Sequence, residues 1–123
     1  MNVYDSVHAL AKALKESEEF KDYQEAKKKL EEDEKAKEML VDFRNYQLQI
    51  QQKQSEGKKV EQEDGEKLKK MFDAINLNLT IKEYLSAEYR FGKMMADVSK
   101  IIGEAIGIEE FEEITGTGKK QEL

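Results

Sequence analysis

The chain has 123 residues, of which 38% are hydrophobic and 39% are charged, and its formal net charge is −6. The length is that of one domain, and the apolar fraction is low for a globular monomer. The negative balance argues against direct binding to nucleic acid, because such a surface gains little from counterion release on a polyanion.

The sequence contains no proline and is rich in Glu, Lys, Leu and Ala, so we predict an all-α fold. Apolar side chains at helical spacing predict three helices in the first half, over about residues 3–16, 18–31 and 34–56. Ser17 and Asp33 stand where N-caps are expected, and each is followed by glutamate in the first turn. Gly57 suits the left-handed position that ends the third helix.

The second half is predicted to contain helices over about residues 62–77 and 81–106. We predict a kink or short break near residues 77–80, because two asparagines interrupt good helix formers and Thr80–Glu83 matches a capping box. A continuous helix is the alternative. Gly92 and Gly103 weaken the last long helix, and a close approach of another helix would compensate for this.

These elements predict an elongated all-α bundle of about five helices, two of them long (about 34–56 and 81–106). Gly107 ends the last long helix, and the apolar spacing beyond it predicts one more short amphipathic turn. We expect residues 1–114 to form a single helical domain and residues 115–123 to form a disordered C-terminal tail.

The helix at 81–106 carries two adjacent apolar rows, which require more than one neighbour. It would be about 39 Å long, whereas a compact domain of this size is roughly 35 Å across. Apolar surface would then face water in a monomer, so we predict a homodimer built on this helix and the proximal part of 34–56. The candidate interface residues are Phe43, Gln47, Ile50, Gln54, Phe91, Met94, Met95, Val98 and Ile102.

No residues show the spacing of a catalytic, cofactor-binding or metal site. The absence of cysteine excludes disulfides, thiol nucleophiles and thiolate-held metal centres. His8 is the single histidine, and Asp5 at i−3 would place two possible metal ligands on one helix face. A di-iron bundle needs two Glu-x-x-His pairs and further carboxylates, which the chain does not supply, and nothing indicates the orienting acid and oxyanion site of a nucleophile. The acidic clusters mostly flank helix starts, where carboxylates are favoured electrostatically. We therefore expect a protein that is not an enzyme and needs no metal or cofactor.

No apolar run approaches the roughly 18 residues of a membrane span, and the first five residues are too polar for a signal peptide. We therefore expect a cytoplasmic protein that does not bind membranes.

One stretch matches a known pattern, which consists of Phe43-Arg44, Gln47, Gln51-Gln52-Lys53-Gln54 and Gly57. It resembles the signature helix of the YlbF/YmcA-like family of small bacterial helical proteins, closest to their YheA branch. The resemblance covers most of the chain. It runs from Tyr4-Asp5 through Ser17-Glu18-Glu19-Phe20 to about Ile106.

The resemblance implies a non-catalytic regulatory adaptor and brings no active site with it. Better-known relatives help to control development, competence and biofilm formation, and associate with the mRNA-processing endoribonuclease machinery. Those relatives carry cysteines linked to an iron–sulfur cofactor, and this chain has none, so a redox function is excluded here. The expected partners are a second copy of the chain and a protein that the sequence does not identify. The alternative function is a coiled-coil holdase that contacts unfolded clients through its glutamine-rich helix end.

Overall fold

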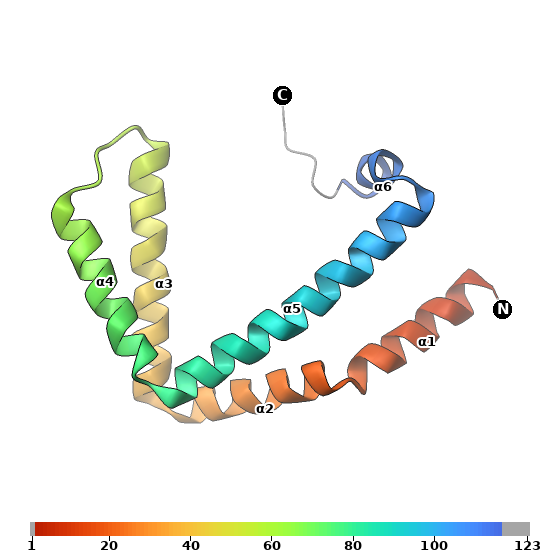
Figure 1. Cartoon of the computed structure of the whole chain (residues 1–123), viewed down its shortest axis with the longest axis horizontal. Helices are drawn as coiled ribbons and strands as arrows, with labels where there is room; N and C mark the ends of the chain where they lie inside the picture. The colour runs from red at the N-terminus through yellow and green to blue at the C-terminus, as the bar shows by residue number, and fades with distance from the viewer. Residues whose placement is uncertain (1, 117–123) are drawn as a thin grey trace. The chain divides into compact units, whose positions relative to one another are not determined.

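The computed structural model describes residues 2–116, which form six helices and no strand (Figure 1). The helices are α1 (Val3–Lys15), α2 (Glu18–Glu32), α3 (Glu34–Ser55), α4 (Gln62–Asn76), α5 (Leu79–Ile106) and α6 (Ile108–Thr115). The all-α prediction is confirmed, with six helices in place of about five. The predicted tail begins with a helical residue, Thr115, and residues 117–123 lie outside the described part of the chain.

The chain divides into two compact units, residues 1–88 and residues 89–123, and each is described by itself. The boundary falls within the residue range of α5. The prediction of a single domain over residues 1–114 stays a prediction.

The predicted helix ends at Ser17, Asp33 and Gly57 are confirmed. The Ser17 hydroxyl accepts a hydrogen bond from the Phe20 amide at 3.2 Å, and Asp33 Oδ1 accepts one from the Ala36 amide at 3.1 Å. Both bonds satisfy an amide that has no partner within the first helical turn. Gly57 follows α3 with a φ of +78°, a conformation that other residues rarely adopt.

The predicted break between the fourth and fifth helices is also confirmed, but the predicted cap is wrong. Asn78 caps α5, because its Oδ1 accepts a hydrogen bond from the Ile81 amide at 3.0 Å and its carbonyl accepts one from the Lys82 amide. The helix therefore begins two residues earlier than predicted, and Thr80 lies inside its first turn.

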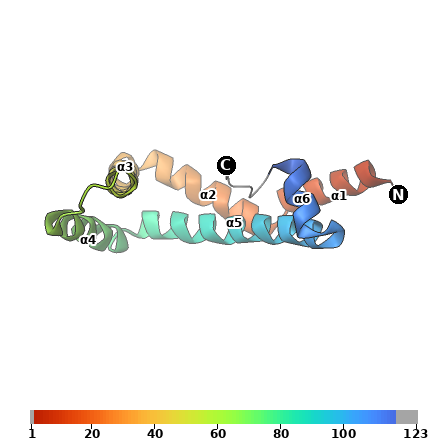
Figure 2. The same cartoon turned by 90° about the horizontal axis from the view of Figure 1, so that it is seen from above.

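The first unit has one apolar core, where α2, α3, α4 and the first turns of α5 meet. Helix α3 packs against both α2 and α4, and α1 packs against α2. Figure 2 views α3 along its axis, with α4 beside it. The turn at Leu77 and Asn78 brings Ile75 and Ile81 into the same core from two different helices. The core residues are Ala26, Leu30, Ala36, Leu40, Ile75, Ile81, Tyr84 and Ala87.

The second unit consists of the α5 segment from Tyr89 onward and α6. Gly107 turns the chain with a φ of +96°, and the Phe111 side chain then packs on Gly103. A Cβ atom added at Gly103 would lie 3.4 Å from Phe111 Cδ2, whereas one added at Gly92 would meet nothing within 4 Å. The close approach predicted for the two glycines is therefore confirmed at Gly103, whereas no part of the described chain approaches Gly92.

Because the Phe111 ring occupies the space above Gly103, we expect Gly103→Leu to detach α6 from α5. Hydrogen–deuterium exchange should then show faster exchange of the amides in residues 108–115 than in the wild type. Gly92→Leu is the matched control, because the same side chain there meets open space. Equal exchange in the two variants would show that the Phe111 contact does not hold α6.

Candidate interaction surfaces

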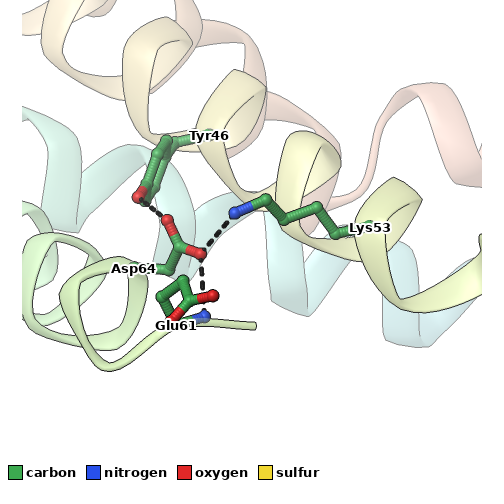
Figure 3. Close-up of polar contacts among 4 residues, drawn as sticks. All are labelled: Tyr46, Lys53, Glu61 and Asp64. Carbon is green, nitrogen blue, oxygen red and sulfur yellow. Dashed lines mark hydrogen bonds and ion pairs between the residues drawn. The ribbon is translucent and has the colours of Figure 1, made fainter. Parts of the chain in front are cut away.

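A polar cluster ties the end of α3 to the start of α4, and Asp64 is at its centre (Figure 3). Asp64 Oδ1 accepts a hydrogen bond from the Tyr46 hydroxyl at 2.8 Å. Asp64 Oδ2 accepts one from Lys53 Nζ at 2.7 Å and one from the Glu61 amide at 3.1 Å. Tyr46 and Lys53 are seven residues apart, so two helical turns place them on the same face of α3. The cluster therefore fixes the hairpin formed by α3 and α4.

The hydrogen bonds from Lys53, Tyr46 and the Glu61 amide lower the pKa of Asp64 to about 2, because all three stabilise the carboxylate. In return, the hydrogen bond to Asp64 raises the pKa of Tyr46 and of Lys53. Lys67 Nζ lies 4.6 Å from the centre of the Tyr46 ring, which adds a cation–π contact. Both oxygens of the Asp64 carboxylate thus accept hydrogen bonds from the protein itself, and two of these bonds connect α4 to α3.

The sign of the pKa shift predicts how the hairpin responds to acid. The pKa of Asp64 is lower in the folded chain than its usual 3.8, so its stabilising contribution is present above about pH 4. It should be lost as the pH falls through about 2. We expect the free energy of unfolding to fall more steeply between pH 4 and pH 2 in the wild type than in Asp64→Asn, as measured by urea denaturation.

The matched control for this experiment is Asp73→Asn, because Asp73 forms only an exposed pair with Lys69 within α4. Its acid dependence should follow that of the wild type. A wild-type profile that coincides with the Asp64→Asn profile would show that the cluster contributes nothing to stability. Sequence reasoning missed this cluster, although an acid three residues after Glu61 at a helix start was a visible capping signal.

In the first unit, the predicted interface residues differ in their surroundings. Phe43 is half-buried and packs against the core, with its ring centre 6.1 Å from that of Phe72 in α4. Ile50 is also half-buried. Gln47 and Gln54 are exposed on α3. Phe43 therefore joins α3 to α4 within the chain, and the two glutamines are the residues of this group that are open to a partner.

In the second unit, the predicted interface residues Phe91, Met94 and Val98 are half-buried, while Met95 is 38% and Ile102 44% exposed. Gly103 is the only buried residue between 89 and 116, so no apolar side chain of this described segment is buried. Further apolar side chains are exposed here that the candidate set did not include. They are Tyr89, Ile101, Ile106, Ile108 and Ile114.

The described residues offer little that resembles a reaction centre. Within residues 2–116, no three His, Cys, Asp or Glu side chains are grouped so that they could hold a metal ion. The same range has no buried polar or charged side chain, and His8 is exposed on α1. None of its helices combines the length and apolar character that a membrane crossing requires. Nothing in this arrangement points to catalysis.

Comparison with known proteins agrees with the sequence pattern. Residues 3–107 match the family model described as "Control of competence regulator ComK, YlbF/YmcA". The chain is 47% identical over 109 residues to a "UPF0342 protein" of Caldicellulosiruptor saccharolyticus, covering 89% of this chain and 91% of that one. It is 44% identical over 117 residues to a "UPF0342 protein" of Halothermothrix orenii, covering 94% of this chain and 99% of the relative.

A solved structure shows the same fold. It is a "Protein of Unknown Function (DUF964) from Bacillus stearothermophilus", with a TM-score of 0.69 and 21% identity, covering 95% of this chain and 98% of that one. The family match and the close relatives together confirm the resemblance inferred from the glutamine-rich helix. The chain belongs to the YlbF/YmcA family.

Proposed function

We propose that this chain is a non-catalytic regulatory adaptor that forms a homodimer and binds a protein partner. Membership of a family described by the control of a competence regulator supports a regulatory role. The observation that carries the proposal is the exposed apolar surface of the second unit. A surface of this kind, on a chain whose residues 2–116 hold no recognisable reaction centre, is typical of a protein that works by binding.

The composition of the second unit supports self-association. Its described residues are rich in isoleucine and methionine, yet none of these side chains is buried. Covering such a row with another apolar surface would remove it from water and so stabilise the helix. A second copy supplies that surface, because a two-fold axis covers the same patch on both chains at once.

The end of α3 is the surface that we propose for the protein partner. Its exposed glutamines offer both hydrogen-bond donors and acceptors without a charge to desolvate. The Asp64 cluster fastens this end of α3 to α4, so the glutamines stand on a rigid support. A preorganised surface loses less side-chain and backbone entropy when a partner binds.

Affinity capture from cells with chemical crosslinking tests the adaptor role. We expect one or two stoichiometric partners, with crosslinks from Lys53 or Lys58 near the end of α3. Gln47→Ala combined with Gln54→Ala should reduce the captured amount. The matched control is Gln24→Ala, another exposed glutamine but on α2. A broad spectrum of unfolded clients would instead support the holdase, and the absence of any protein partner would refute both functions.

A further inference from the structure

A small hollow of about 180 Å³ opens on the surface of the first unit, between α2, α3 and the first turns of α5. Its floor is apolar, because Leu30, Leu40 and Tyr84 line it and all three are buried core residues. Val41, which is exposed, stands at its edge. The volume is well below the roughly 300–1,000 Å³ of small-molecule sites and suits one large apolar side chain.

The charges around the hollow are mostly positive. Lys27, Lys37 and Arg44 line it, against a single lining carboxylate, Glu31. Arg44 is already engaged, because its Nη2 atom lies 2.8 Å from Glu88 Oε1. The two lysines therefore provide most of the positive charge available to a ligand. Glu34 and Glu38 line an adjoining opening that shares Lys37 and Val41, so the excess of cations is confined to the lining of the hollow itself. Within the hollow, this positive lining favours an acidic ligand.

We infer that this hollow is the docking site for an acidic segment of the partner protein, in which one leucine-sized side chain is flanked by carboxylates. The apolar side chain fills the floor, and the flanking carboxylates face Lys27 and Lys37. A nucleic-acid backbone fits the site poorly, because its phosphates cannot fill the apolar floor, which only a partner with an apolar side chain can cover. The inference rests on the proposed adaptor function and names the chemistry of the partner.

The test uses the purified full-length protein and a defined peptide library. Each 12-residue peptide carries a central Leu or Phe, with Asp or Glu at one and four positions before it and three positions after it. One control library replaces the acids by Gln or Asn, and a second replaces the central residue by Ser. We expect the acidic apolar library to be retained about tenfold more strongly than either control, because both the charge and the apolar side chain contribute.

Variants locate the binding on the protein. Lys27→Glu combined with Lys37→Glu should weaken the retention about tenfold, since two attractive charge contacts become repulsive. The matched control combines Lys28→Glu with Lys29→Glu, which makes the same charge change on α2 at residues that do not line the hollow. Val41→Glu, at an exposed position, should also abolish retention without disturbing the core.

Three outcomes would overturn the inference. Equal retention of the acidic library and the Gln or Asn library would show that charge is not recognised. An equal loss of peptide retention in the two lysine double variants would show that acidic peptides are attracted to the basic side chains of α2 in general and not to the hollow. No retention of any library would show that the hollow is not a docking site. None of these results depends on the capture experiment. A negative result with the peptides would therefore leave the adaptor function standing, and a negative capture experiment would leave peptide binding at the hollow standing.

Discussion

Replacing Ile81 by alanine is expected to lower the free energy of unfolding by about 2–5 kcal/mol, the usual loss when a buried isoleucine leaves a cavity. Ile81 is 0% exposed and stands in the core where four helices meet. The total stability of a domain is only about 5–15 kcal/mol, so a loss of this size is a large part of it. Urea denaturation at one fixed protein concentration measures the change.

Leu79→Ala is the control for this substitution. Leu79 lies in the same first turn of α5 and is of similar size, but it is 69% exposed. Its removal should change the free energy of unfolding by less than about 1 kcal/mol, because little apolar surface returns to water. Similar losses in the two variants would mean that Ile81 is not at the centre of the stabilising contacts.

Placing a charge on the apolar row of the second unit is expected to convert the proposed dimer into a monomer. Met95→Glu would bury a carboxylate in the interface between copies, at a cost of several kcal/mol per ion. Light scattering should report about twice the chain mass of 14.3 kDa for the wild type across a hundredfold dilution, and about the chain mass itself for the variant. Val98→Glu, one turn further along, should act in the same way.

Ala96→Glu is the control for the interface variants. It adds the same single charge to the same helix, but at an exposed position that the apolar row does not include. Its mass should remain that of the dimer. A wild-type chain that is monomeric at every concentration would refute the dimer, and a Met95→Glu dimer would place its interface on another surface.

The helix ends were the most predictable part of this structure, because their signals are local. Ser17, Asp33 and Gly57 each act on neighbours within a few residues, so the sequence pattern alone identifies them. The start of α5 was harder. Thr80 and Asn78 are both acceptable N-caps, and only the position of the first helical carbonyl decides between them.

Contacts between helices were not predictable from the same signals. Gly92 and Gly103 look alike in the sequence, yet only Gly103 has an aromatic ring packed on it. In the sequence, Asp64 is one of several acids at a helix start. Only the pairing of α3 with α4 brings Tyr46 and Lys53 within hydrogen-bonding distance of it. Both depend on which helices become neighbours, and periodicity along one helix does not contain that information. The proposed dimer surface stays a prediction for the same reason.

The small size of the core has a consequence for how the family changes through evolution. Among residues 2–116, only eight apolar residues are buried, and three of these are alanines. Every other described residue except Gly103 keeps contact with solvent. At most positions the side chain therefore has to be compatible with a helix and with water, but it does not have to fit a closely packed core. Most substitutions should therefore cost little stability. This agrees with the solved Bacillus stearothermophilus structure, which has the same fold at a TM-score of 0.69 with only 21% sequence identity. The outer faces of these helices can therefore change in sequence while the scaffold stays the same.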